Sequence, residues 1–132
     1  MSLRPVVAAA LAFGLALTAT GPALAQDAAV GGKAFIRCSI CHAVTPGAPN
    51  KMGPNLAGVV GRKAGGLPGY KYSPAMAAAG FAWTKPKLDA YLAAPQAVVK
   101  GNKMIFPGLT DPKQRADVIA YLATLRADPL SR

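Results

Sequence analysis

Two cysteines and the only histidine of the chain stand together in the run Cys38-Ser39-Ile40-Cys41-His42. The spacing Cys-x-x-Cys-His is the attachment sequence of c-type haem. Near the end of a helix, two thiols three residues apart lie on one face, so each can reach one vinyl group of the macrocycle. The next residue then lies beneath the iron, where an imidazole can act as the proximal ligand. We therefore predict thioether bonds at Cys38 and Cys41 and an iron ligand at His42.

Three other uses of the cysteine pair explain less of the motif. A zinc site normally needs four Cys or His ligands in two separated pairs, and the chain has no second pair. A thioredoxin-like dithiol belongs to a strand-helix-strand context, which the flanking sequence does not indicate. A structural disulfide is the ordinary expectation for two cysteines in an exported chain, but it leaves His42 without a role.

The sixth position of the iron decides between electron transfer and ligand or substrate chemistry. With no second histidine, the candidates are Met52, Met76 and Met104. Met104 lies in a stretch punctuated by Gly and Pro, residues 100–108, which indicates a loop able to wrap the far side of the haem. Met52 follows His42 closely in sequence, and Met76 lies in an Ala-rich helical stretch where methionine usually fills core. We predict Met104 as the second iron ligand; the alternative is a core methionine and an open iron.

The segments that must position these residues show helical rather than alternating apolar patterns, so we expect an all-α chain. The first helix is predicted to run from about Ala28 into the haem motif, and the last to open at Asp111-Pro112. Apolar side chains recur at helical spacing in the last helix, which should pack against the first. They are Val118, Ile119, Leu122 and Leu125.

Two shorter helices are predicted between these ends, joined by loops rich in Gly and Pro. Ser73-Pro74 starts one helix that Gly80 stops, and Thr84 caps another that Pro95 interrupts. Ordering so much loop costs about 1 to 2 kcal/mol of backbone entropy per residue. A covalently attached haem would offset that cost, because the loops can pack against its apolar surface. We expect a compact holoprotein and a largely unfolded apoprotein.

The start of the chain has the three-part layout of a secretory signal peptide. Arg4 lies in a short basic region, residues 6–17 are apolar, and small residues end at Ala25 before Gln26. The apolar stretch is shorter than the roughly 20 residues of a membrane-spanning helix. We predict that residues 1–25 are cleaved after export and that residues 26–132 form one domain without a membrane span.

The charge balance indicates an acidic partner. The chain carries 15 Lys and Arg against 5 Asp and Glu, a formal net charge of +10. Such a balance speeds encounter with acidic surfaces at low salt. Export disfavours nucleic acid, and the basic residues are scattered rather than set along one helix with interleaved aromatics. A redox protein with an acidic docking face is the expected partner.

From Gly31 to Leu125 the chain resembles a class I cytochrome c, close to the mitochondrial proteins and their bacterial periplasmic relatives. The matching pieces follow the order of the family and cover almost all of the predicted mature chain. They are Gly31 and Phe35, the haem motif, Gly53-Pro54-Asn55-Leu56, Gly61-Arg62-Lys63, Tyr70-Lys71-Tyr72-Ser73, Trp83, Tyr91-Leu92 and Lys103-Met104-Ile105-Phe106. The resemblance implies a small cytochrome c fold, with a few helices and long loops wrapped around one covalently bound haem.

The resemblance also implies roles for residues that would otherwise look ordinary. The Pro54 carbonyl would accept a hydrogen bond from the His42 ring, and Arg62, Tyr72 and Trp83 would bind the haem propionates. Tyr91 would pack beside the haem with its hydroxyl near the Met104 sulfur. The chain departs from the mitochondrial pattern at two positions: Met76 replaces an asparagine and Asn102 replaces a threonine. Whether Asn102 contacts a propionate is left open.

The function implied is that of a soluble periplasmic electron carrier, a monomer and not an enzyme. Its partners would be a cytochrome bc-type donor and an oxidase-type acceptor, which would meet basic residues around the haem edge. By resemblance these are Arg37, Lys51, Lys71, Lys100 and Lys103. Two alternatives stay open: a cytochrome subunit bound permanently to a periplasmic dehydrogenase, and a sensor or peroxidase-like protein with an open iron.

Overall fold

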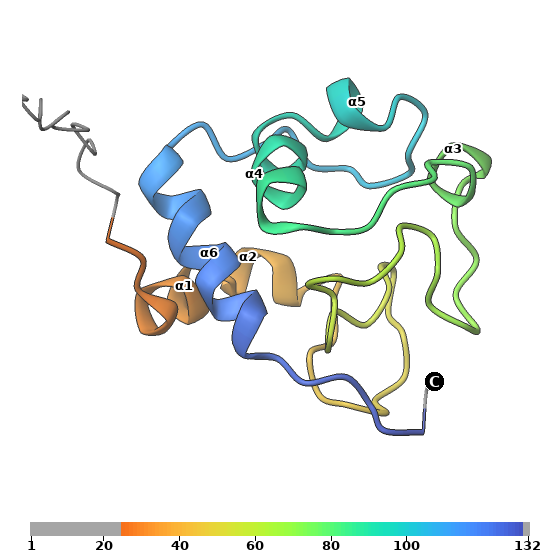
Figure 1. Cartoon of the computed structure of the whole chain (residues 1–132), viewed down its shortest axis with the longest axis horizontal. Helices are drawn as coiled ribbons and strands as arrows, with labels where there is room; N and C mark the ends of the chain where they lie inside the picture. The colour runs from red at the N-terminus through yellow and green to blue at the C-terminus, as the bar shows by residue number, and fades with distance from the viewer. Residues whose placement is uncertain (1–24, 131–132) are drawn as a thin grey trace, which may run out of the picture.

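The computed structural model describes residues 25–130, where short helices are joined by long loops (Figure 1). Between residues 25 and 130 no strand forms, apart from an isolated antiparallel bridge between Lys63 and Ala82. The prediction of an all-α chain is therefore confirmed. In chain order the helices are α1 (Ala28–Ala34), α2 (Ile36–Ser39), α3 (Pro74–Ala77), α4 (Lys85–Ala93), α5 (Pro95–Val98) and α6 (Pro112–Thr124).

The predicted helix starts are confirmed by side-chain caps. The Ser73 hydroxyl accepts the amide of Met76, and the Thr84 hydroxyl accepts the amide of Lys87. The Asp111 carboxylate caps α6 in the same way. Each cap satisfies an amide that the first helical turn leaves without a partner.

Three helices differ from the prediction, and one of them, α3, ends at Ala77 before the chain reaches Gly80. The first helix is not continuous, because at Phe35 the chain tightens and the amide of Cys38 bonds to the Phe35 carbonyl only three residues back. Pro95 does end α4, but it also begins the single turn of α5. Proline suits that position because its fixed φ matches a helix and its missing N–H would have no partner there.

Helix α1 crosses α6 with almost no space between their backbones (Figure 1). A Cβ built on Gly31 would lie 1.9 Å from the carbonyl oxygen of Asp117, so only glycine permits this approach. Beside the crossing, Phe35 packs on Tyr121 with ring centroids 5.2 Å apart. The predicted packing of the first helix on the last is thus confirmed.

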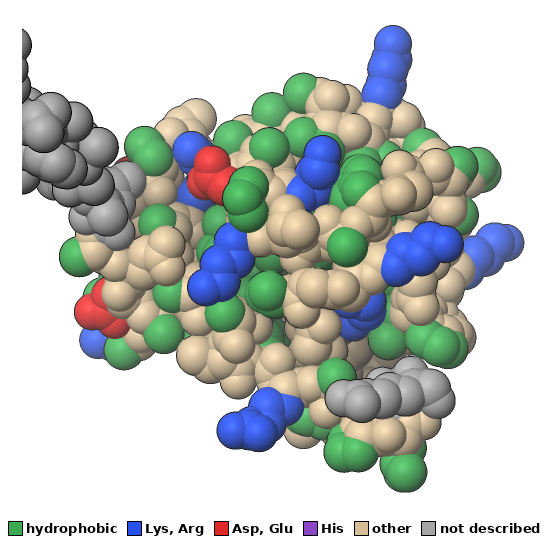
Figure 2. All heavy atoms as spheres, viewed as in Figure 1, with side chains coloured by type: hydrophobic (Ala, Val, Ile, Leu, Met, Phe, Trp, Pro, Cys, Tyr) green, Lys and Arg blue, Asp and Glu red, His purple; other side chains and the backbone are tan. Residues whose placement is uncertain are grey.

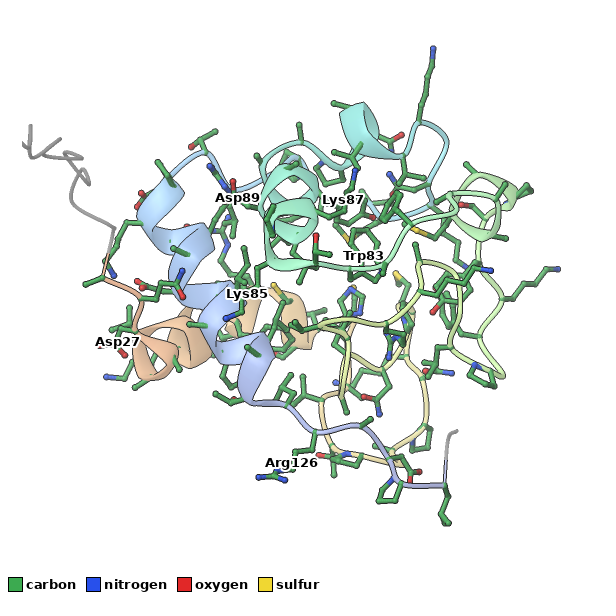
Figure 3. The ribbon with its side chains drawn as sticks, viewed as in Figure 1. Asp27, Trp83, Lys85, Lys87, Asp89 and Arg126 are labelled. Atoms are coloured by element: carbon green, nitrogen blue, oxygen red, sulfur yellow. The ribbon has the colours of Figure 1, made fainter. Side chains whose placement is uncertain are left out.

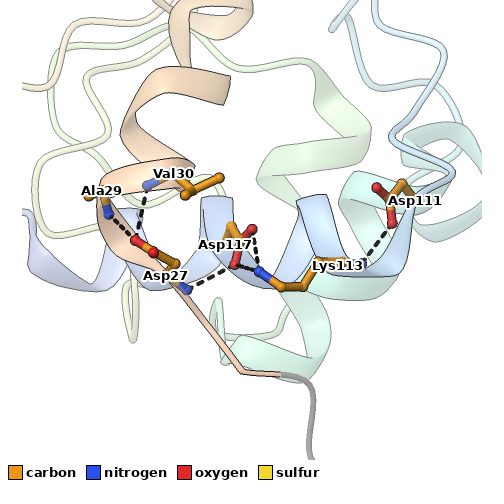
Figure 4. Close-up of polar contacts among 6 residues, drawn as sticks. All are labelled: Asp27, Ala29, Val30, Asp111, Lys113 and Asp117. Carbon is orange, nitrogen blue, oxygen red and sulfur yellow. Dashed lines mark hydrogen bonds and ion pairs between the residues drawn. The ribbon is translucent and has the colours of Figure 1, made fainter.

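The crossing is tied by one buried carboxylate (Figure 4). Asp117 is 2 % exposed; it accepts the amide of Asp27 at 2.9 Å and pairs with Lys113 at 2.6 Å. Asp27 in turn caps α1 by accepting the amides of Ala29 and Val30. The start of α1 and the middle of α6 therefore share one hydrogen-bond network.

The core extends from this helix pair toward the loops. Val118, Ile119 and Leu122 of α6 are buried, as predicted, and Leu125 is partly buried. The core also includes Phe35, Val59, Ala64, Met76, Trp83, Leu88, Tyr91, Val99 and Leu109.

Backbone hydrogen bonds join two loop segments that are distant in sequence. The amide of Trp83 donates to the Arg62 carbonyl, and the amide of Gly61 donates to the Trp83 carbonyl, each at 2.8 Å. Arg62 and Trp83 are therefore held side by side. No sequence pattern indicates this pairing, which is too short to form a strand.

The predicted signal peptide falls on residues that the structure leaves undescribed, up to residue 24, so its cleavage stays a prediction. None of the helices between residues 25 and 130 has the length and hydrophobicity needed to cross a bilayer.

Candidate haem-binding site

One cavity brings together all the site residues predicted from sequence. Its wall is largely apolar and is formed by α2, α3, α4, α6 and the intervening loops. The predicted residues that border it are Cys38, Cys41, His42, Pro54, Arg62, Tyr72, Trp83, Tyr91 and Met104. Residues as far apart in sequence as Cys38 and Met104 thus face one space.

The His42 ring is fixed on one wall of the cavity. Its Nδ1 lies 2.8 Å from the Pro54 carbonyl oxygen, which can only accept, so Nδ1 carries the proton and Nε2 keeps its lone pair. Burial lowers the pKa of His42, and Arg62 and Lys51 lower it further, while the bond to Pro54 opposes them. A neutral imidazole with a free Nε2 is the form that binds a metal.

Gly53 leaves room for that ring. A Cβ built there would lie 2.4 Å from Cε1 of His42. The sequence showed Gly53 only as part of the family pattern, and its role depends on how closely the loop approaches the ring.

The cysteines lie beside His42 and are not joined to each other. Cys38 and Cys41 are free and half-buried. Among residues 25–130 no three His, Cys, Asp or Glu side chains gather so as to hold a metal ion. Neither the disulfide nor the zinc alternative gains support from this arrangement.

Met104 borders the cavity with a hydroxyl beside its sulfur. The Tyr91 hydroxyl lies 3.9 Å from Sδ of Met104. Burial raises the pKa of Tyr91 to about 12, so the phenol keeps its proton and can donate it to the sulfur. Met52 and Met76 also border the cavity, but Met52 is 76 % exposed with its sulfur near Cys41. Met76 packs in α3 as a core residue, as predicted.

Arg62 supplies the polar part of the wall. Its terminal nitrogens donate to the carbonyls of Asn55 and Ala57, whereas its buried Nε has no partner. A buried N–H without a partner is costly, and a carboxylate in the cavity would satisfy it. The Tyr72 hydroxyl accepts the amide of Leu67 and keeps its own hydrogen to donate. The residues present therefore fit a haem, with thiols, an imidazole and a thioether around an apolar space and donors for its propionates.

Two asparagines have contacts that the sequence did not reveal. Asn55 is 7 % exposed, and its side chain bonds to the backbone of Thr45, Ala48 and Ala57, which shapes the loop beneath Arg62. Asn102 is equally buried and bonds to α5 and to Met104. Only the surrounding carbonyls and amides define these roles, so no local pattern could have shown them.

Comparison with known proteins agrees with this fold and site. The sequence model of the family "Cytochrome c" matches residues 19–126. The chain belongs to the cytochrome c family, and proteins of this family bind one covalently attached haem c. The predicted resemblance to class I cytochromes c is thereby confirmed.

Particular relatives are similar over almost their whole length. The cytochrome c2 of Blastochloris viridis is 43 % identical over 120 residues, covering 89 % of this chain and 94 % of the relative. The cytochrome c2 of Rhodomicrobium vannielii is 47 % identical over 119 residues, covering 90 % and 91 %. Among solved structures, cytochrome cH from Methylobacterium extorquens superposes with a TM-score of 0.71 at 47 % identity, covering 75 % of this chain and 99 % of that one.

Proposed function

We propose that the chain is a soluble periplasmic electron carrier, with haem c attached to Cys38 and Cys41 and its iron ligated by His42 and Met104. The observation that carries the proposal is that His42 and Met104 border one cavity, each with its own hydrogen-bond partner. The similarity to cytochromes c2 supports an electron carrier. Bound haem supplies one-electron chemistry between the ferric and ferrous states of its iron.

The residues beside the two ligands hold and tune them. The Pro54 carbonyl fixes the orientation of the His42 ring and raises its basicity by accepting the Nδ1 hydrogen. The Tyr91 hydroxyl donates toward the Met104 sulfur and draws electron density from it. A thioether ligand and a buried site both favour the reduced state, so the reduction potential should be high for a haem protein.

Arg62, Tyr72 and Trp83 are proposed to bind the propionates. The unpartnered Nε of Arg62 and the hydroxyl hydrogen of Tyr72 are donors on the cavity wall. Trp83 is 7 % exposed and packs on Tyr91, with ring centroids 4.7 Å apart. Donors of this kind offset the desolvation of a buried carboxylate.

We propose a carrier and not an enzyme, because Met104 would fill the position at which a substrate could reach the iron. The Tyr91 hydroxyl, the nearest acid to that sulfur, is directed at it and keeps its proton.

The surface supports docking of an acidic partner. Figure 2 shows Lys and Arg side chains spread over the visible face, with acidic groups at its left, where Figure 3 labels Asp27 and Asp89. Arg37 and Lys103 border the cavity, and Lys51 donates to the Ser39 carbonyl beside the haem motif. We propose that these residues, with Lys71 and Lys100, steer a cytochrome bc-type donor and an oxidase-type acceptor.

Cleavage after Ala25, release into the periplasm and a monomeric state are part of the same proposal. Mass spectrometry of the protein purified from the periplasm would show the cleavage directly.

The visible spectrum of the holoprotein tests the ligand assignment, compared with Met104→Ala and with carbon monoxide added to the reduced form. We expect a low-spin wild type with a weak far-red ferric absorption that the variant loses. Carbon monoxide should bind only to the variant. A wild type that binds carbon monoxide readily has an open iron, which would contradict the carrier and favour a sensor or enzyme.

A permanently bound subunit is the second candidate, because large apolar side chains are exposed near the cavity. Ile40, Met52 and Ile105 are 79 %, 76 % and 98 % exposed. Co-purification from the periplasm at low and high salt separates the two cases. A mobile carrier leaves its partner at high salt, whereas a permanent complex survives it.

A further inference from the structure

Asn102 connects α5 to the backbone of Met104. The side chain is buried and borders the cavity. Its amide nitrogen donates to the carbonyl oxygens of Pro95 at 3.2 Å and Val99 at 2.8 Å. Its amide oxygen accepts the backbone N–H of Met104 at 2.9 Å. Both hydrogens of the amide are therefore used within the protein, and none is left to donate to a propionate.

The backbone of Asn102 is held as well. Its N–H donates to the Val99 carbonyl, and its carbonyl accepts from Nε2 of Gln96 at 3.0 Å. Gln96 also accepts the amide of Gly101. Asn102 is thus fixed to α5 through both its side chain and its main chain.

Beyond Asn102 the chain is held by side-chain contacts: Lys103 donates to the Lys71 carbonyl, and Phe106 packs against the core. Within the described part of the chain, residues 103–108 make no backbone–backbone hydrogen bond, and the next is the amide of Leu109 donating to Leu92. Met104 lies inside this stretch. Apart from the packing of its side chain against the core, the hydrogen bonds to Asn102 and to the Tyr91 hydroxyl are therefore what holds it against the cavity.

We infer that Asn102 is the positioning residue for Met104: by tying the Met104 amide to the carbonyls of α5, it sets how readily the sulfur leaves the axial position. The inference rests on the proposed function, in which Met104 ligates the iron. A threonine at this position could still accept an amide two residues on through its hydroxyl, though more weakly. With a single hydroxyl hydrogen, it could not donate to the carbonyls of Pro95 and Val99 at once.

Imidazole titration of the ferric holoprotein measures this property, because imidazole binds only when the methionine sulfur leaves. The variants are Asn102→Ala, Asn102→Thr and Gln96→Ala. Gln96→Ala is the matched control, since it removes bonds to the same loop but leaves the contact between Asn102 and Met104 intact. The thermal unfolding temperature and the far-red absorption of each variant are recorded alongside.

We expect Asn102→Ala to bind imidazole about tenfold more tightly than the wild type, because it removes the bond that holds the Met104 amide, and the net contribution of one hydrogen bond corresponds to about that factor. Its far-red absorption should weaken. Asn102→Thr should fall between Asn102→Ala and the wild type. Gln96→Ala should lower the unfolding temperature while keeping the imidazole affinity of the wild type.

The inference is overturned if Asn102→Ala and Gln96→Ala change the imidazole affinity equally, since Asn102 would then act only through stability. If Asn102→Ala yields no holoprotein, the test rests on Asn102→Thr. An imidazole affinity equal to that of the wild type in Asn102→Thr then overturns the inference. A wild type that binds imidazole as tightly as Met104→Ala shows instead that Met104 is not a ligand. That result defeats the proposed ligation, and the role of Asn102 with it.

Discussion

The α1–α6 crossing and the cavity are closed in different ways. At the crossing, protein atoms meet directly, with the Asp117 carbonyl seated where Gly31 has no side chain. Around the cavity, apolar side chains and the unpartnered Nε of Arg62 face a space that protein atoms do not fill. Helices as short as α1 and α6 are marginal alone. The crossing therefore orders the two ends of the described chain by itself, whereas the core around the cavity is completed only by a bound cofactor.

Removal of the proposed thioether bonds should have the largest effect on the fold. We expect the double variant Cys38→Ser, Cys41→Ser to lose haem attachment and about half or more of its helical circular dichroism signal. Without a haem to pack against, the loops have no apolar contacts that offset the entropic cost of ordering them. The wild-type holoprotein prepared in parallel is the control. An apoprotein that unfolds cooperatively would show that the crossing sustains the fold alone.

A substitution at the crossing tests the region that needs no cofactor. Gly31→Ala should lower the free energy of unfolding of the holoprotein by about 3 kcal/mol or more, because the new methyl group meets a backbone carbonyl that cannot move aside. Gly32→Ala is the matched control, since its Cβ would lie 3.2 Å from the movable ring of Tyr121. Guanidinium denaturation measures both, and equal effects would contradict the importance of the close approach.

A substitution beside the cavity should instead change the iron spectrum. Gly53→Ala places a methyl group against the His42 ring, so we expect a loss of about 1 to 3 kcal/mol of stability from overpacking and some high-spin character. Gly61→Ala provides the control: it introduces backbone strain at φ +87° but meets nothing within 4 Å. If Gly53→Ala keeps the spectrum of the wild type, the loop that carries Gly53 moves and the His42 ring stays in place.

The pH dependence of the crossing should be the smallest effect. Lys113 and the Asp27 amide lower the pKa of Asp117 below its ordinary 3.8. Its stabilising contribution is therefore complete above that value and is lost as the pH falls through the lowered folded value. Asp117→Asn should flatten this acid limb in urea unfolding curves of the holoprotein, and Lys113→Gln should flatten it partly. If both variants lose stability at acid pH as the wild type does, other carboxylates are responsible for that loss.

The sequence indicates the His42 side of the cavity more directly than the Met104 side. Residues 38–42 indicate the His42 side by themselves, because the spacing of the two cysteines and the histidine is the one that haem attachment requires. Helix caps at Ser73, Thr84 and Asp111 were equally local and are confirmed. The pairing of Arg62 with Trp83 was not predictable from periodicity, since it depends on backbone bonds between distant loops. Asn102 was left open for the same reason, because its partners are carbonyls of a turn that the sequence did not indicate.

The helices that meet at Gly31 come from opposite ends of the described chain. Under the proposed export, a chain threaded through the membrane N-terminus first delivers Cys38 and Cys41 to the periplasm long before α6 arrives. Until then α1 has no surface to lie on, and the thiols stay accessible on an open polypeptide. The order of translocation therefore leaves an interval for haem attachment, which ends when the last helix reaches the first.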